Sequence, residues 1–411
     1  MKNILKKCIT FFLILASIDM CFGTLLITHA RATSDFLIEN GVLVAYKGHS
    51  SSIRVPSSVK KIGANAFKGN GHVTKVSLPK NVTVIEEQAF MDCKNLQTVR
   101  FPNKLKSIEN KAFAYCNSLK TVTLPENLKI IGSKAFIDCK NLTHIEFSDN
   151  IEKIGDYAFG YCENLKQIRC PDALKSIGAN AFYCSNLKNI TLNNELKKIG
   201  NFAFAYTNLK NISIPDSVNN MGSGAFMSCY ALKTVKLPKN NKAKITSDLF
   251  SRCSLEEVIV PNGYTKIESS AFFECKALKK VTLPDSIKTI DKNAFAYCEA
   301  LEQLILPSQL RKISNSAFYF CKSLKSIVIP VNVTEVKAYA FSHCDSLEKI
   351  SFTGKNTKLN QSSIGGDTHE NTEEKLAHVK NLIFSCPQDS VAYNMYLKYY
   401  AKYTNVTLEL I

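Results

Sequence analysis

The sequence predicts a solenoid in which about thirteen short coils of 22–24 residues stack side by side. The first reason is a motif that recurs along most of the 411 residues, and the second is a proline that closes nearly every copy. The third is a hydrophobic content of 45%, which supplies a large core and excludes disorder of the whole chain. A period in the twenties is typical of solenoids, because a single unit must share its apolar side chains with its neighbours.

One unit of the motif shows how a coil is expected to fold. Val122 and Leu124 alternate with polar residues, which predicts a short β-strand with these two side chains inward. Pro125 ends the strand, since proline cannot donate a hydrogen bond to a ladder. We expect a single helical turn to follow and to bury Phe136 and Cys139. The phenylalanine recurs thirteen times, at Phe67, Phe90, Phe113, Phe136, Phe159, Phe182, Phe204, Phe226, Phe250, Phe272, Phe295, Phe318 and Phe341.

Most cysteines follow the same period. Eleven of the 15 occupy one repeat position: Cys93, Cys116, Cys139, Cys162, Cys184, Cys229, Cys253, Cys275, Cys298, Cys321 and Cys344. Neighbouring rungs lie about 4.8 Å apart, so distance alone does not exclude disulfides, but side chains in a column point the same way. We therefore expect buried, reduced thiols, with occasional disulfides as the alternative. The spacing gives no zinc signature, and we expect neither a metal nor a cofactor.

Residues 1–32 have the features of a secretory signal peptide. Three lysines precede an apolar run, and Ala30-Arg31-Ala32 offers a small-x-small cleavage site. An uncleaved membrane anchor is the alternative, although Asp19 splits the run below the ~20 residues that spanning requires. Cleavage would lower the formal net charge of +17 by three, to +14. The sequence thus predicts a secreted or cell-surface protein whose mature chain has no transmembrane segment.

The unit L-x-x-[IV]-x-[LI]-P-x-x-[LV]-x-x-I-G-x-x-A-F-x-x-C resembles the BspA-like leucine-rich repeats of bacterial surface proteins, and residues 53–352 match it almost without a break. Residues 33–52 look like that family's N-terminal hairpin cap, with Asn40-Gly41 as its turn, and residues 381–411 like its C-terminal strand–helix–strand cap. Residues 353–380 are polar and do not repeat, which indicates an inserted loop.

The resemblance implies an α/β repeat fold. It is a right-handed leucine-rich-repeat solenoid with a parallel sheet on its concave face, short helical turns and a cap at each end. It also implies an exported, surface-associated binding protein without catalytic residues. Several members of the family are adhesins for extracellular host proteins.

The outward strand positions supply the first candidate binding surface. A row of lysines without acidic neighbours, which we call the lysine strip, is formed by Lys166, Lys188, Lys210 and Lys233, and the adjoining column adds Arg169 and Lys236. Like charges about 5 Å apart repel by roughly 0.8 kcal/mol in water. A strip that costs stability indicates a site for an anionic glycan or wall polymer. The alternative is that these lysines only aid solubility. From Lys233 to Glu348 lysine and glutamate alternate, which indicates a structural role.

The second candidate surface is apolar. Ile259, Ile305 and Val328 occupy the outward strand position, and outward apolar residues on a concave sheet indicate a protein contact. The sequence carries no catalytic motif, and no nucleic-acid-binding motif accompanies its positive charge. We therefore expect a non-enzymatic adhesin that engages extracellular host or neighbouring-cell proteins through its sheet face. Binding of an anionic polysaccharide and a structural role as a spacer in a surface layer are the alternatives.

Overall fold

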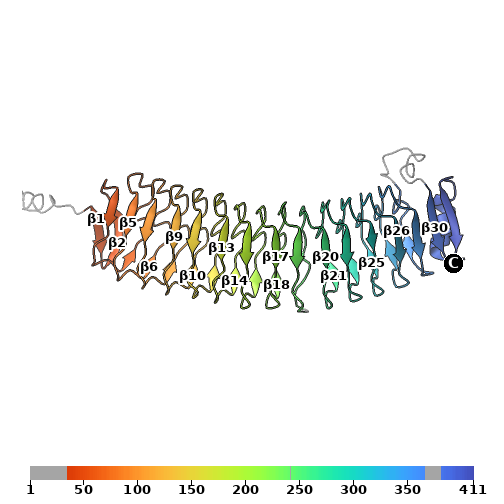
Figure 1. Ribbon diagram of the computed structural model, residues 1–411, viewed down its shortest axis with the longest axis horizontal. Helices are drawn as coiled ribbons and strands as arrows, with labels where there is room; N and C mark the ends of the chain where they lie inside the picture. Colours follow the sequence, from red (N-terminus) through yellow and green to blue (C-terminus); the bar gives the residue numbers. More distant parts are fainter. Residues whose placement is uncertain (1–34, 241, 366–380) are drawn as a thin grey trace, which may run out of the picture.

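The computed structural model describes residues 35–240, 242–365 and 381–411. The expected signal peptide and residues 366–380 of the expected polar loop lie outside these ranges. The described chain forms a long, gently bent rod of stacked coils, with its first and last strands at opposite ends (Figure 1). It makes about 15 turns of ~23 residues with little helix. Further turns therefore lie at the ends of the thirteen coils that carry the repeated phenylalanine.

Each coil contributes a short strand to one face of the rod, which we call the strand face. The proline of the motif ends each of these strands where it is present. They are β3 (Ser52–Arg54), β5 (Lys75–Ser77), β7 (Thr98–Arg100), β9 (Thr121–Thr123), β11 (His144–Glu146), β13 (Gln167–Arg169), β15 (Asn189–Thr191), β17 (Asn211–Ser213), β19 (Thr234–Lys236), β20 (Glu257–Ile259), β22 (Lys280–Thr282), β24 (Gln303–Leu304), β26 (Ser326–Ile329) and β28 (Lys349–Phe352).

A second face consists of two-residue strands. Each places one apolar side chain, such as Ile131, in the core. These strands are β4 (Lys61–Ile62), β6 (Val84–Ile85), β8 (Ser107–Ile108), β10 (Ile130–Ile131), β12 (Lys153–Ile154), β14 (Ser176–Ile177), β16 (Lys198–Ile199), β18 (Asn220–Met221), β21 (Lys266–Ile267), β23 (Thr289–Ile290), β25 (Lys312–Ile313), β27 (Glu335–Val336) and β29 (Lys358–Leu359).

On both faces the strands are parallel and equivalent residues pair from coil to coil. Val122 pairs with Ile145 on the strand face, and Ile131 pairs with Ile154 on the second face. Inward positions therefore stay inward along the whole rod, because a shift of one residue would turn every side chain to the opposite side. The same register lines up the outward side chains in columns that run along the rod.

The third side of each coil contains turns where we predicted a single helical turn. The N–H groups of Lys134, Phe136 and Asp138 donate to carbonyls of the next coil, at 2.7, 2.9 and 2.8 Å. The intervening amides of Ala135 and Ile137 close turns to the residue three positions earlier, as a helical turn would. Lys134 and Asp138 adopt positive φ angles of 59° and 56°. This alternation directs every second N–H along the rod, so the helical prediction is wrong in this respect.

The core is a continuous stack of the repeated phenylalanines. Neighbouring rings lie 4.6–5.7 Å apart between centroids and are tilted by at most 18°. Each ring is fully buried between two coils. Because every coil covers the ring of its neighbour, the apolar surface is shared along the rod, which is how repeats of this length become stable.

Ten of the eleven aligned cysteines form a buried column beside this stack. Each thiol donates to the carbonyl of the phenylalanine in the preceding coil, as Cys139 does to Phe113 at 3.2 Å. All cysteines in the described ranges are free thiols. Burial raises the pKa of the Cys139 thiol to about 12, so the thiol stays protonated and unreactive near neutral pH.

Cys184 departs from this column. The turn between Phe182 and Leu187 is one residue shorter than in most coils, so Cys184 falls on the left-handed position, with a φ of 54°. Its side chain is half-buried, and Ser185 takes the place in the column. The sequence analysis did not predict this shift. It aligned Cys184 with the other cysteines, although the missing residue lies next to this position.

The two ends of the rod are closed by different elements. β1 (Phe36–Glu39) and β2 (Val42–Tyr46) form an antiparallel hairpin whose turn residues, Asn40 and Gly41, have positive φ angles of 49° and 79°. β2 then pairs with the second face. At the other end, β30 (Leu382–Cys386) and β31 (Val406–Leu410) extend the strand face, joined by the helix α2 (Val391–Met395) and the π-helical turn η1 (Tyr396–Tyr400).

Residues 353–365 form a further coil, although we predicted that an inserted loop begins at residue 353. β29 pairs with β27, and the N–H groups of Tyr339 and Phe341 donate to the carbonyls of Ser362 and Ser363, at 2.8 and 2.7 Å. The sequence pattern missed this coil because Thr353 replaces the proline and no Ala-Phe pair follows. The hydroxyl of Thr357 bonds the Val333 carbonyl at 2.7 Å and satisfies a polar side chain inside the coil.

Candidate binding surfaces of the strand face

The lysine strip lies on consecutive rungs at the edge of the strand face. The N–H of Lys188 donates to the carbonyl of Lys166 at 2.8 Å, and Lys210 bonds Lys188 in the same way at 3.3 Å. Lys233 continues the row, with a 3.0 Å bond to the Lys210 carbonyl. All four side chains are exposed. The structure therefore brings these lysines into one row.

Two of the predicted cations are paired with carboxylates. Lys233 Nζ lies 3.0 Å from Glu256 Oε1. Arg169 reaches Asp149 at 2.6 Å and Asp172 at 3.3 Å, and its hydrogen bond holds the pKa of the Asp149 carboxyl below its usual value. The prediction of an unpaired row was wrong at Lys233, and Arg169 is held by two aspartates from the loops after the strands. Within the described ranges no ion pair involves Lys166, Lys188, Lys210 or Lys236.

The alternating row continues the lysine strip towards the C-terminus. Its amides form the same ladder, for example from Glu348 to the Lys325 carbonyl at 2.8 Å. In the adjoining column, Lys280 pairs with Glu257 at 3.2 Å. Carboxylates therefore lie among the cations of this half, and the electrostatic character of the strand face changes along the rod.

The apolar patch consists of Ile259, Ile305, Val328 and Val331, and the sequence analysis had missed the last of them. Their exposed fractions are 61%, 87%, 53% and 65%. The first three share the outward strand position, and Val331 follows the strand-ending proline of its coil. Ile259 pairs with Thr282, so a small side chain lies next to a large one. The patch is exposed to solvent, although the same coils bury their inward aliphatic strand residues.

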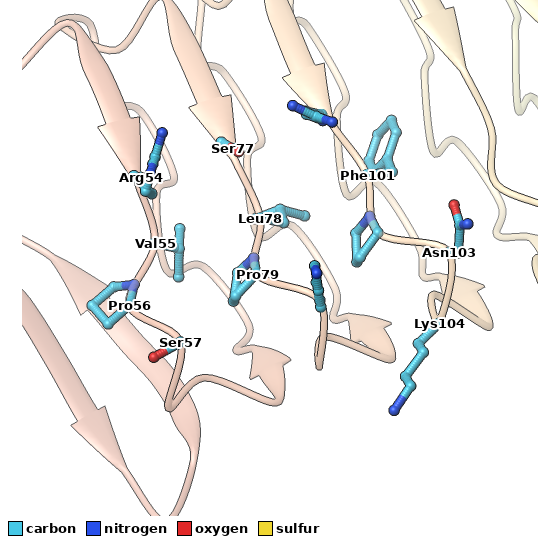
Figure 2. Close-up of a pocket in the computed structure, with 13 residues that line it drawn as sticks. Arg54, Val55, Pro56, Ser57, Ser77, Leu78, Pro79, Phe101, Asn103 and Lys104 are labelled. Atoms are coloured by element: carbon cyan, nitrogen blue, oxygen red, sulfur yellow. The ribbon is translucent and has the colours of Figure 1, made fainter.

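A third surface, which sequence reasoning did not find, is a groove near the N-terminus. This N-terminal groove has a volume of about 880 Å³ and runs past the ends of β3, β5 and β7 (Figure 2). It is lined by Arg54, Val55, Pro56, Ser57, Ser77, Leu78, Pro79, Lys80, Arg100, Phe101, Pro102, Asn103 and Lys104. Arg54 and Arg100 occupy the column that also holds Arg169 and Lys236. Both arginines could have been predicted by continuing that column to the first coils of the sequence.

We also searched the described ranges for metal-binding clusters and for membrane-spanning helices. There, no group of three or more histidine, cysteine, aspartate or glutamate side chains is arranged to hold a metal ion. No helix in those same ranges is long and apolar enough to cross a membrane.

Comparisons with known proteins agree with this architecture. A sequence model of the BspA type leucine rich repeat region, six copies long, matches residues 44–163, 129–243 and 243–369. A leucine-rich repeat protein from Bacteroides ovatus is 30% identical, with a TM-score of 0.65 over 79% of this chain and 96% of its own. A leucine rich cell surface protein from Faecalibacterium prausnitzii is 29% identical, with a TM-score of 0.52 over 88% of this chain and 94% of its own.

A more distant structure shows the same fold. The pneumococcal vaccine antigen PcpA is 19% identical, with a TM-score of 0.54 over 91% of this chain and 96% of its own. Proteins of curated function give no significant match.

Proposed function

The chain belongs to the family of BspA type leucine-rich repeat proteins, and from this premise we propose that it is a non-enzymatic binding protein of the cell surface. It is exported by the signal peptide of residues 1–32 and engages an extracellular protein, from the host or a neighbouring cell, through the strand face. The similarity to a cell surface protein from Faecalibacterium prausnitzii supports this location.

The apolar patch is the observation that carries the proposal. Ile305 exposes 87% of its surface, and its apolar neighbours lie on nearby coils of the same face. Single exposed apolar residues are common, but several on one rigid face favour a protein contact. Such a patch gains free energy when a partner removes it from water, at roughly 25 cal/mol per Å² of apolar surface. The partner's complementary surface would therefore be apolar at its centre and polar at its rim.

Binding to immobilised fibronectin, laminin and collagen, measured by surface plasmon resonance, tests the proposal. We expect Ile305→Lys to weaken binding to the recognised protein by about tenfold or more, because it places a charge in the centre of the contact. Binding of the unaltered protein should persist in about 500 mM NaCl, since apolar contacts are not screened by salt.

Ile130→Lys is the matched control. Ile130 is also an exposed isoleucine, at 47%, but it lies on the second face of the rod. This variant should bind as well as the unaltered protein, and both variants should keep the melting temperature. Equal binding by all three proteins would refute the apolar patch as the contact. Self-assembly without any soluble ligand would instead favour a spacer in a surface layer.

The lysine strip supports a second candidate function, binding of an anionic glycan or wall polymer. Lys166, Lys188 and Lys210 lie on consecutive rungs and have no ion pair within the described ranges. Polymer binding through this strip should weaken steeply with salt. Lys188→Gln combined with Lys210→Gln should abolish it without lowering the melting temperature, because the change removes a like-charge repulsion. Unchanged polymer binding by this variant would exclude the lysine strip.

A further inference from the structure

The N-terminal groove places two arginines on either side of a small residue. Arg54 pairs with Ser77 in the strand register, and Ser77 pairs with Arg100. The two arginines are thus two rungs, or roughly 10 Å, apart along the rod. Both side chains are exposed, and neither forms an ion pair with any residue in the described ranges. An anionic group above Ser77 could therefore be reached by a guanidinium from each side.

Two lysines among the lining residues add to this charge. Lys80 follows the strand-ending proline of its coil and Lys104 lies two residues beyond Pro102. Figure 2 shows Pro56 and Pro79 in a row, with Arg54 on one side of that row and Lys104 on the other. No acidic residue lines the groove. Its four cations therefore line one groove without an acidic residue among them, which attracts an anionic ligand.

The backbone around the groove excludes one common mode of peptide binding. The N–H of Val55 donates to the Ser77 carbonyl at 3.0 Å, and the N–H of Leu78 donates to the Arg100 carbonyl at 3.1 Å. These amides are used by the ladder between coils. A peptide that binds by adding a strand needs an open sheet edge, and the wall of this groove offers none. Recognition must come from side chains.

Apolar side chains also line the groove. Pro56 and Pro79 are half-buried, and so is Phe101, whose ring is held edge-on against Phe113 at 5.7 Å and 90°. Proline rings and an aromatic ring present the kind of surface on which the C–H faces of sugar rings pack. The two arginines, two rungs apart, also match a ligand whose charges repeat at regular intervals.

We propose that the N-terminal groove binds a linear anionic polysaccharide. Its carboxylate or sulfate groups lie at Arg54 and Arg100, where a guanidinium can make two parallel hydrogen bonds to one anionic group. Its sugar rings lie along the proline row. This site is separate from the apolar patch and from the lysine strip.

Isothermal titration calorimetry with three six-unit probes in about 150 mM NaCl tests the proposal. The probes are a heparin hexasaccharide, which carries sulfates, hexagalacturonate, which carries only carboxylates, and hexaglutamate. We expect at least one saccharide to bind, and Arg54→Gln combined with Arg100→Gln to weaken it by about tenfold or more. The matched control is Lys153→Gln with Lys198→Gln, which removes two exposed lysines from the second face and should leave this binding within about twofold.

The outcomes separate the two anionic sites. Unchanged saccharide binding by the arginine variant would overturn the groove, and loss of that binding in Lys188→Gln with Lys210→Gln would favour the lysine strip instead. Equal loss in the arginine variant and in the second-face control would overturn the groove as a defined site, since net charge alone would then explain binding. Hexaglutamate binding as tightly as the saccharides would replace a polysaccharide by an acidic peptide. The absence of saccharide binding would also refute the proposal, while the apolar patch would stand or fall on its own test. Unchanged melting temperatures would show that both variants are folded.

Discussion

One outward backbone position, taken on three consecutive coils, carries different chemistry in two regions of the strand face. Near the N-terminus it holds Arg54, Ser77 and Arg100, and further along it holds Ile259, Thr282 and Ile305. In both places a small hydroxyl residue lies between two long side chains on neighbouring coils, because the strand register lines up equivalent positions. The backbone thus supplies a repeated frame, and the choice of outward side chain decides whether a stretch of that frame attracts an anion or an apolar surface.

The interior does not distinguish the two regions. The rings of Phe67 and Phe90 are 4.6 Å apart near the groove, and those of Phe272 and Phe295 are 5.2 Å apart beside the apolar patch. Inward residues must fit the coil before and the coil after, so they vary little, whereas outward residues contact mainly solvent. Ligand specificity can therefore differ along the rod at little cost in stability.

Alkaline pH should have the largest effect, because it acts on the core that both regions share. Burial raises the pKa of Cys93, Cys139 and Cys275 to about 12. Since an unfolded cysteine has a pKa of about 8.5, such a thiol stabilises the fold fully below that value. The contribution falls as the pH rises towards 12, by about 1 kcal/mol for each thiol one pH unit above 8.5. Summed over several thiols, this loss approaches the free energy of unfolding of a typical domain.

We therefore expect thermal unfolding, followed by circular dichroism, to shift steeply to lower temperature between about pH 8.5 and 10. Cys139→Ala combined with Cys275→Ala should flatten this dependence, because it removes two of the groups that gain a charge on unfolding. A melting temperature that stays constant over this pH range would contradict a column of buried, protonated thiols.

Removal of a core ring should cost nearly the same in both regions. Phe90→Ala, beside the groove, and Phe295→Ala, beside the apolar patch, should each lower the free energy of unfolding by about 3–5 kcal/mol, since each leaves a cavity between coils. Urea denaturation would measure the loss. A near-neutral result at one site would show that the stack is not continuous there, and the two regions would no longer share one frame.

Exchanging the outward side chains tests the comparison most directly. Ile259→Arg combined with Ile305→Arg recreates the arginine–small–arginine arrangement in the apolar region. We expect a heparin hexasaccharide to bind this second site about 1 kcal/mol more weakly than the groove, because Glu257 lies on the same strand as Ile259 and Glu256 directly precedes that strand. Protein binding through the patch should be lost. Calorimetry that shows no second saccharide site would mean that the apolar lining of the groove, and not the arginine pair, controls binding.

Thiol labelling should give the smallest change, since it alters no interaction in the folded protein. Cys184 is half-buried, and the column cysteines are fully buried. A short exposure of the native protein to iodoacetamide should modify Cys184 before the others, and peptide mass spectrometry would identify the site. Labelling of column cysteines at the same rate would indicate that the coils open readily, and Cys184→Ser would then leave the labelling pattern unchanged elsewhere.

Much of the fold could be predicted from the sequence, because the repeat imposes the same requirements on each coil. Strand positions, the proline stop, the phenylalanine stack and most of the cysteine column follow from one alternating pattern read many times. The candidate surfaces could be predicted from the sequence only in part. Ile259, Ile305 and Val328 could be placed outward from strand alternation, but the pairing of Arg169 with Asp149 depends on a loop that strand columns do not include.

The sequence by itself determined the repeat length and which side chains face the core, since burial of an apolar residue in every coil leaves one register that satisfies all of them. Only the tertiary structure decided which cations are neutralised, that Cys184 leaves its column, that residues 353–365 complete a coil, and that Arg54 and Lys104 flank one groove. These features depend on the lengths of individual turns and on side chains that meet from neighbouring coils. A periodic pattern treats such coils as identical and does not describe the contacts between them.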